Sequence, residues 1–309
     1  MKIAALAGGV GGARLAHGLS LTLPPDDLNV IVNTGDDFAI FGLYLCPDLD
    51  TVTYTLAGIA NPQTGWGIQD DTFYTFEAIK ANGGPSWFRL GDRDLATHLE
   101  RTRLLQEGKS LTEVASHFNQ LWHVKHPVLP MCDQAVPTLV DTREHGRLTF
   151  QEYFVKYRWE PRIQSLHFSH IDQAKPSEKV MNALRTADVV IICPSNPLVS
   201  IDPILSLAGV RDILKTKYTL AVSPIIGGAA IKGPLAKMVT ELGLEVSPVT
   251  VANHYADYLN CIFIDIQDES YAKLINQSGI IVQVTDILMP DATARKRLAA
   301  EIINYLKKN

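Results

Sequence analysis

The sequence predicts an α/β protein in which a mostly parallel sheet carries helices on both faces. Short apolar segments of strand length alternate with segments of helical periodicity at both ends of the chain. The segment 188–193 (DVVIIC) is apolar after its first residue, which is typical of a central parallel strand buried on both faces. A glycine-rich turn at 8–12 joins the first apolar segment to a helical one, as in the opening of a βαβ unit.

The elements of this sheet follow from local signals along the chain. The first part is a strand over 3–7, a helix over 13–21 and a second strand over 29–32. After residue 170, Gly243 is placed to end a helix and Asp291 to begin the last one. The predicted strands there are 188–193, 218–222, 261–266 and 280–285, and the predicted helices are 177–185, 203–214, 234–242 and 291–307.

The middle of the chain has a different character, with many aromatic residues and helical patterns. A helix over 71–80 is stopped by the Asn-Gly-Gly-Pro segment at 82–85, and the capping-box pattern at 110–113 begins another. The segment 148–159 fits either a strand or a helix. We therefore expect a nucleotide-binding core formed by residues 1–44 and 171–309, with residues 45–170 as a mainly helical insertion that covers the active site.

Composition excludes several classes of protein. The 309 residues are 46% hydrophobic and 20% charged, as expected for a chain with a large core. The net charge of -5 argues against bulk attraction to nucleic acid. Its four cysteines lie far apart, without the spacing of a zinc site. The sequence has neither a signal peptide nor a run of eighteen apolar residues, so we expect a cytoplasmic protein without a membrane span.

In a parallel sheet, ligands bind at the carboxyl ends of the strands. This rule brings together the loops 8–12, 33–37, 194–200 and 223–233. Glycines at 8–12 allow the backbone to approach a phosphate, and the helix that follows contributes its positive end. The motif is incomplete, because Arg14 stands where the third glycine of G-x-G-x-x-G would be, and a tight turn without a ligand is the alternative.

Carboxylates are dense in the first third of the chain. The adjacent Asp36 and Asp37 repel each other, and a divalent cation would offset that repulsion, although a solvated turn explains the pair equally well. Asp50 is a better functional candidate than Asp70, because Asp70 or Asp71 precedes a helix and fits a cap.

Two further groups of residues fit the binding of anions. The guanidinium groups of Arg89 and Arg93 suit bidentate contacts to phosphate or carboxylate, whereas His98 has the setting of a structural histidine. The loops 194–200 and 223–233 offer hydroxyl, amide and backbone N–H groups, with two glycines and Lys232 in the second. Either loop alone is ordinary; together they indicate a nucleotide or a ligand with several phosphates.

Six blocks of the sequence, in order along nearly the whole chain, resemble the CofD family of 2-phospho-L-lactate transferases. They are LAGGVGGARLAHGL (6–19), VNTGDDF (32–38), GLYLCPDLDTVTYTLAG (42–58), WFRLGDRDLATHLERTRLL (87–105), CPSNPLVSI (193–201) and SPIIGGAAIKGPLAKM (223–238). The third and fourth blocks are the most specific of the six.

This resemblance implies a Rossmann-like fold, a homodimer, a requirement for Mg²⁺ and a place in coenzyme F(420) biosynthesis. The reaction it implies joins the ribityl hydroxyl of the deazaflavin Fo to a phospholactate-type group, taken from a guanosine diphosphate-linked donor with release of GMP. It also implies residue roles. Asp50 and Arg89 would contact Fo and carry catalysis; Gly9, Gly11, Gly12, Asn33 and Thr34 would line the core pocket; Ser195, Asn196, Gly228 and Lys232 would contact the donor; and Asp36, Asp37 and Asp50 would hold the metal.

Two other interpretations remain at this point. A YvcK-like nucleotide-sugar-binding regulator shares the glycine loop and the loop at 223–234, but the blocks at 46–50 and 87–99 are of the CofD type. A Rossmann oxidoreductase is disfavoured by the broken glycine motif and by the lack of a single acid after the second strand. The sequence leaves open which three-carbon acid the donor carries.

Overall fold

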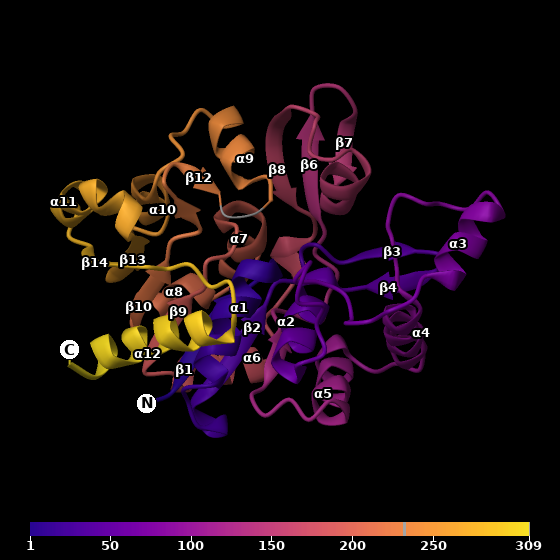
Figure 1. Ribbon diagram of the computed structural model, residues 1–309, viewed down its shortest axis with the longest axis horizontal. Coiled ribbons are helices and arrows are strands. Elements are labelled where there is room, and N and C mark those ends of the chain that lie inside the picture. Colours follow the sequence, from indigo (N-terminus) through magenta and orange to yellow (C-terminus); the bar gives the residue numbers. More distant parts are fainter. Residues whose placement is uncertain (231–232, 309) are drawn as a thin grey trace.

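The computed structural model describes residues 1–230 and 233–308 and has a parallel sheet of seven strands at its centre (Figure 1). Every strand pair in this sheet is parallel. The predicted α/β class is therefore confirmed. In spatial order the strands are β14 (Ile281–Thr285), β13 (Cys261–Asp265), β10 (Tyr218–Val222), β9 (Val189–Ile192), β1 (Ile3–Ala7), β2 (Leu28–Val32) and β5 (Val128–Pro130).

Helices cover both faces of the sheet, because successive strand residues point to opposite sides and both sets are apolar. In β1, Ala4 and Leu6 belong to one buried cluster, while Ile3 and Ala5 belong to the other. The second cluster is closed by α1 (Gly9–Ser20), α2 (Pro47–Ala57), α5 (Leu111–Leu121) and α12 (Ala292–Lys308). The first is closed by α6 (Glu178–Thr186), α7 (Asp202–Leu205), α8 (Val210–Leu214), α9 (Leu235–Glu241), α10 (Pro248–His254) and α11 (Ala272–Gln277).

The order of the strands in the sheet determines where a ligand-binding crevice can form. β1 pairs with β2 on one side and with β9 on the other, and the chain builds the sheet outward in both directions from there. Loops that leave β1 and β9 therefore diverge to opposite faces and open a crevice at the carboxyl ends of the strands. These loops are 8–12 and 194–200, two of the four predicted to meet.

An arm projects from the core and begins at residue 38, before the predicted start of the insertion (Figure 1). It contains the hairpin of β3 (Phe38–Ile40) and β4 (Leu43–Leu45), then α3 (Tyr74–Ala81) and α4 (Asp92–Gln106). Two aspartates in this arm each cap the start of a helix. Asp92 accepts hydrogen bonds from the N–H groups of Tyr74 and Thr75 at the start of α3, and Asp71 accepts them from Arg93 and Asp94 at the start of α4. Asp71 is thus a cap, as expected for Asp70 or Asp71, but it caps α4 and not α3.

The rest of the insertion differs from the predicted division at two points. Residues 128–130 form β5, an edge strand of the main sheet, although they lie within the segment assigned to the insertion. A separate antiparallel sheet follows, made of β6 (Thr138–Thr142), β7 (Gly146–Thr149) and β8 (Ile163–Phe168). Its short strands lack a clear alternation in the sequence, so their pairing depends on distant partners. The boundaries at 45 and 170 stay a prediction.

Most local signals have the predicted outcome. Ser110 and Glu113 form the capping box of α5, and Asp291 accepts from the N–H of Ala294 at the start of α12.

The helix predicted over 203–214 is instead two short helices, α7 and α8, separated by a turn at Gly209 with a φ of +79°. The segment 148–159 contains the end of β7 and a π-helical turn at Glu152–Lys156. No helix of the described chain has the length and hydropathy needed to cross a bilayer.

Candidate functional site

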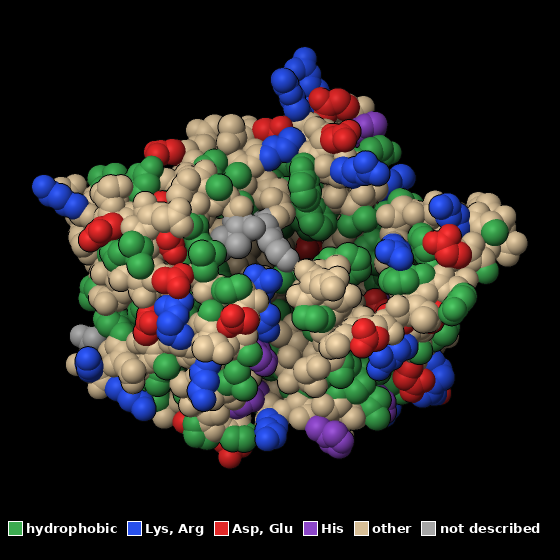
Figure 2. Space-filling view, viewed as in Figure 1, with side chains coloured by type: hydrophobic (Ala, Val, Ile, Leu, Met, Phe, Trp, Pro, Cys, Tyr) green, Lys and Arg blue, Asp and Glu red, His purple; other side chains and the backbone are tan. Residues whose placement is uncertain are grey.

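A cavity of about 650 Å³ lies at the carboxyl edge of the sheet, where loops from β1, β2 and β9 meet the insertion. This volume is in the range of small-molecule and cofactor sites. Figure 2 shows the face hollowed near its middle, with acidic side chains visible inside and apolar side chains around the opening. Its polar lining residues include Arg14, Asp36, Asp48, Asp50, Arg89, Asp94, His98, Gln151, Ser195, Asn196 and Ser200.

The glycine loop forms one wall of the cavity and is clamped to the loop after β9. Ser195 Oγ accepts from the N–H of Gly8 at 3.0 Å and donates to its carbonyl at 2.8 Å. At Gly11, a Cβ atom would lie 2.2 Å from the carbonyl oxygen of Pro194, so only glycine allows this approach. The first turn of α1 therefore lies at the cavity wall, a setting that favours an anion, and Asp48 accepts a hydrogen bond from the backbone of Gly9 there.

Asn33 organises the loop after β2 from a fully buried position. Its Nδ2 donates to Asp48 Oδ2 at 3.0 Å and to the carbonyl of Val199 at 3.2 Å, while its Oδ1 accepts from the N–H of Gly35. One side chain thus joins three loops and fixes the position of Asp48, which α2 brings to the cavity.

Three buried carboxylates, those of Asp36, Asp37 and Asp48, lie close together beside this asparagine. Burial raises the pKa of Asp36 well above its usual value, and the charges of Asp48 and Asp37 raise it further. Burial also raises the pKa of Asp48, to about 6, although hydrogen bonds from Asn33 and the backbone of Gly9 lower it. Among the described residues, Asp36 Oδ1 has no hydrogen-bond donor. Such a group requires a cation or protons to be stable.

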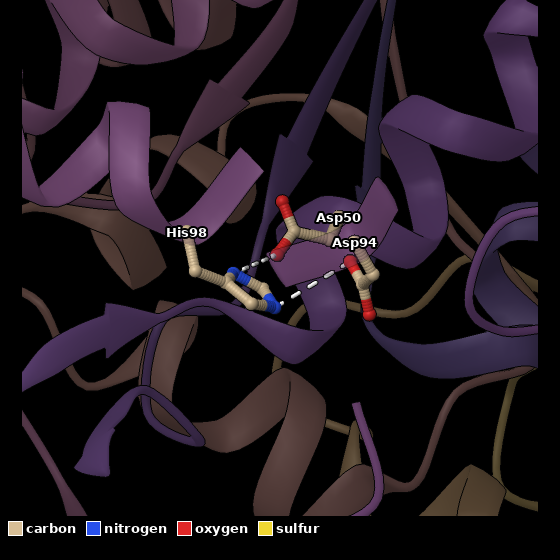
Figure 3. Close-up of side chains that lie close together, drawn as sticks. All are labelled: Asp50, Asp94 and His98. Atoms are coloured by element: carbon tan, nitrogen blue, oxygen red, sulfur yellow. Dashed lines mark ion pairs between the residues drawn. The ribbon is translucent and has the colours of Figure 1, made fainter. Parts of the chain in front are cut away.

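Asp50 lies on α2 within a network that reaches α4 (Figure 3). Arg101, which is 1% exposed, donates to Asp50 Oδ1 and, at 2.9 Å, to His98 Nδ1. His98 lies between two carboxylates, 3.7 Å from Asp50 Oδ2 and 3.4 Å from Asp94 Oδ1. Burial raises the pKa of Asp50, and the charge of Arg101 acts against that rise.

The atoms of Asp50, Asp94 and His98 lie within 4.8 Å of one another, which is the spacing of a metal site. The hydrogen bonds that Arg101 makes to His98 and Asp50 argue against metal binding by these three residues. Because a guanidinium only donates, His98 Nδ1 must accept, so the neutral ring carries its proton on Nε2 and offers no lone pair to a metal. Arg101 already supplies positive charge to Asp50. The pair of Asp36 and Asp48, which line the cavity beside the glycine loop, fits a hard divalent cation better.

Aromatic side chains form the upper walls of the cavity. From the insertion, Phe150, Phe154 and Trp159 make a ladder of stacked rings, with successive centroids 5.5 Å and 5.3 Å apart. The arm contributes a second group, which includes Trp66 and Trp87. Aromatic side chains in a cavity lining suit a flat heterocycle.

Comparison with known proteins adds to this geometry. Residues 3–304 match the family model described as 2-phospho-L-lactate transferase CofD. The chain belongs to the CofD family. It is 39% identical to the phosphoenolpyruvate transferase of Streptomyces griseus over 100% of this chain and 99% of that protein. It is 38% identical to the 2-phospho-L-lactate transferase of Methanosarcina mazei over 96% of this chain and 97% of that protein.

Membership in the CofD family makes the chain a transferase and settles the choice against the YvcK-like alternative. The crystal structure of BH3568 from Bacillus halodurans, a member of the UPF0052 family, supports the fold alone. Its TM-score is 0.62 at 16% identity, and the match covers 98% of both chains.

The structure brings many of the predicted site residues to one cavity. Those that line it are Gly9, Gly11, Asp36, Asp50, Arg89, Ser195 and Asn196. Gly12, Asn33, Thr34 and Asp37 are packed behind the wall and not on it. Gly228 is exposed in the turn between β11 (Ile225–Ile226) and β12 (Ala229–Ala230), away from the cavity lining, and Lys232 lies outside the described residues.

Sequence reasoning misses several residues that the CofD cavity contains. Asp48, Tyr54, Asp94 and His98 are not among the predicted site residues, although all four line the cavity. The spacing of Asp94 and His98 at i and i+4 on one helix face is a signal that the sequence offers. No local pattern marks Arg101, because its partner Asp50 is 51 residues away.

Proposed function

We propose that this protein transfers a phospho-three-carbon acid group, 2-phospho-L-lactate or a close relative, from a guanosine diphosphate-linked donor to the deazaflavin Fo in coenzyme F(420) biosynthesis. The observation that carries the proposal is the free oxygen of Asp50. Its Oδ1 is bound by Arg101, whereas Oδ2 is buried and, among the described residues, has no hydrogen bond; the residue as a whole belongs to the cavity lining. A binding protein has no need of such a group, but a transferase that must accept a proton does.

In this reaction the ribityl hydroxyl oxygen of Fo attacks the phosphorus that bears the three-carbon acid. The new P–O bond forms as the phosphoanhydride bond breaks, and GMP leaves with the bridging oxygen and its electrons. The hydroxyl proton moves to Asp50 Oδ2. Burial makes this carboxylate a stronger base than one in water, and Arg101 holds it in a single orientation.

Mg²⁺ is the metal we propose, held by Asp36 and Asp48, and it would neutralise charge on the transferring phosphoryl group. Support comes from the unmatched negative charge of these two buried carboxylates beside the glycine loop. Asp37 is adjacent in sequence but does not line the cavity, so we assign it a lesser role. Asp50 is kept for proton transfer because Arg101 occupies its other oxygen.

The remaining walls suit the two substrates. The ladder of Phe150, Phe154 and Trp159 offers a stacking surface to the deazaflavin ring of Fo. Ser195 and Asn196, with the first turn of α1, lie where the phosphates of the donor would approach. The homodimer and the cytoplasmic location stay predictions.

Arg89 is expected to contribute mainly to transfer. It is exposed at the cavity, and its guanidinium carbon lies 3.6 Å from the ring centroid of Phe73. Arg89→Ala should lower kcat/KM by about 100-fold, as when one donor to a developing anion is removed. Steady-state kinetics and the melting temperature, which should barely change, test this together. Arg93→Ala, four residues along and outside the cavity lining, is the matched control and should keep its activity.

The buried carboxylates predict an unusual dependence of stability on pH. Because the folded protein raises the pKa of Asp48 to about 6, it binds more protons than the unfolded chain between about pH 4 and 6. This contribution to stability is therefore present below pH 4 and is lost as the pH rises to 6. In EDTA, the melting temperature should fall across this interval.

Mg²⁺ should reverse that loss. Its stabilising effect should be larger at pH 7.5, where the ligands are ionised, than at pH 5. Asp48→Asn should remove most of this metal-dependent gain. Equal gains at both pH values would argue against these carboxylates as ligands.

The direct test of the function is an assay with purified protein, Fo, Mg²⁺ and a guanosine diphosphate-linked donor. GMP should appear only when Fo is present, together with a deazaflavin product of higher mass. Folded protein that binds the donor but releases no GMP would identify a binding protein.

A further inference from the structure

Three basic side chains gather between α1 and α12 without a hydrogen-bonded acidic partner among the described residues. Arg14 and His17 lie on α1, and Arg295 lies on α12. The helices touch at Gly18, where a Cβ atom would lie 2.2 Å from the carbonyl oxygen of Arg295. This contact holds the three side chains in one small region, which we call the basic cluster.

The basic cluster lacks acceptors. Nε of Arg14, Nε of Arg295 and Nδ1 of His17 are all buried, and within the described chain none has a hydrogen-bond partner. Neither arginine forms an ion pair with any described residue. Burial lowers the pKa of both arginines, and each of His17 and Arg295 has its pKa lowered further by a neighbouring arginine. At Arg295 the charge of Asp291 raises the pKa, but this effect is smaller than the lowering by burial and by Arg14. The three residues are half-buried, and like charges that are partly removed from water favour the binding of an anion beside them.

The basic cluster reaches the cavity already described through Arg14, whereas His17 and Arg295 are not in the cavity lining. The loop 287–290 that leads into α12 also lines the cavity. Arg14 and Arg89 are the only arginine or lysine side chains in that lining, as far as the described residues go. The second of these lies on the arm, far along the chain from the glycine loop.

Acidic and basic side chains therefore lie on different sides of the cavity. On this face of the sheet α1 packs against α2 on one side and α12 on the other (Figure 1). The carboxylates of Asp48 and Asp50 come from α2, whereas the basic cluster lies on the side of α12. Figure 2 shows blue and purple side chains gathered below the hollow, near the middle of the face. A ligand with an anionic end and a reacting centre would be oriented by this division.

We propose that Arg14, His17 and Arg295 form an oxyanion subsite that binds the guanosine-side phosphate of the donor, the group that leaves as GMP. The inference rests on the proposed function and extends it by naming residues for this phosphate. A phosphate has several acceptor oxygens, and guanidinium groups bind it through paired N–H donors. The subsite would hold the leaving group apart from the carboxylates that serve metal binding and proton transfer.

The test compares Arg295→Gln with Lys296→Gln. Both variants remove one positive charge from α12, and neither residue is in the cavity lining, but Lys296 is exposed, whereas Arg295 is half-buried beside Arg14. Isothermal titration calorimetry should measure the Kd for GDP and for GMP, with and without MgCl₂. We expect Arg295→Gln to raise both Kd values at least about tenfold, the effect of losing one charge-assisted hydrogen bond. Lys296→Gln should change them less than twofold.

The melting temperature separates binding from folding. Because Arg295 has no hydrogen-bond partner at Nε and repels Arg14, its neutralisation should leave the melting temperature unchanged or raise it. Inorganic phosphate should stabilise the wild-type protein and not Arg295→Gln. Wild-type binding of GDP with unchanged affinity in Arg295→Gln would overturn the subsite and leave the transferase intact. Failure of the wild-type protein to bind GDP or GMP at all would overturn the proposed donor, and the subsite with it.

Discussion

Asp36→Asn should make the metal-free protein more stable and at the same time remove most of its transferase activity. The carboxylate is buried against Asp48 and Asp37, and both burial and repulsion raise its pKa. A neutral amide of the same shape relieves that repulsion, so the melting temperature in EDTA should rise by a few degrees, at about 2–4 °C for each kcal/mol gained. Loss of a metal ligand should lower kcat by about 10²–10³-fold, because several kcal/mol of charge stabilisation depend on the ion.

Asp37→Asn is the matched control for this experiment. Asp37 is the next residue, is equally buried and also has a raised pKa, but it does not line the cavity. Its neutralisation should also stabilise the metal-free protein, while transfer should be affected far less. If both variants lost activity to the same degree, the division of roles between these adjacent carboxylates would be wrong. A fall in the melting temperature of Asp36→Asn would contradict the repulsion between them.

Arg101→Gln should cause the largest loss of stability among these variants. The guanidinium is buried and binds Asp50, His98 and the carbonyl oxygen of Tyr44. Its removal leaves Asp50 as a buried charge without its partner, a change that costs about 3–5 kcal/mol. For a protein of this size the melting temperature should fall on the order of 10 °C. Thermal unfolding followed by circular dichroism measures this directly.

Two further variants make the interpretation specific. Arg103→Gln changes the same residue type on the same helix, but Arg103 is exposed and pairs with Glu100 and Glu107 at the surface. It should leave the melting temperature almost unchanged. The double variant Asp50→Asn with Arg101→Gln should regain part of the lost stability, because both buried charges are gone. Additive losses would show that Arg101 stabilises the fold by packing and not through Asp50.

The core of the fold can be predicted from the sequence because its signals are local. Each strand of the main sheet other than β5 is a short apolar run, and the turn at 8–12 and the caps at Ser110 and Asp291 are set by neighbouring residues. The edge strand β5 and the sheet β6–β8 escape prediction, since a three-residue strand and a weakly alternating one are defined by partners far along the chain.

The same distinction applies to the site. Loops at the ends of parallel strands meet by the rule of the fold, so the sequence alone is enough to place Gly11, Asp36 and Ser195 in one region. The network around Asp50 is beyond such reasoning, because it joins α2 to α4 across 51 residues and depends on how the arm packs. The sequence marks Arg14 only as a departure from a glycine motif, yet this side chain lines the cavity as part of the basic cluster.

The identity of the reaction is the central claim, and one measurement tests it directly. Purified protein should be incubated with Fo, Mg²⁺ and, in turn, donors in which guanosine diphosphate is linked to lactate, to enolpyruvate or to glycerate, with GMP release and product mass read by mass spectrometry. We expect GMP in proportion to a phosphodiester of Fo with at least one donor, and the mass of that product identifies the acid. Folded wild-type protein that forms no deazaflavin product with any of the three donors would contradict the proposed function.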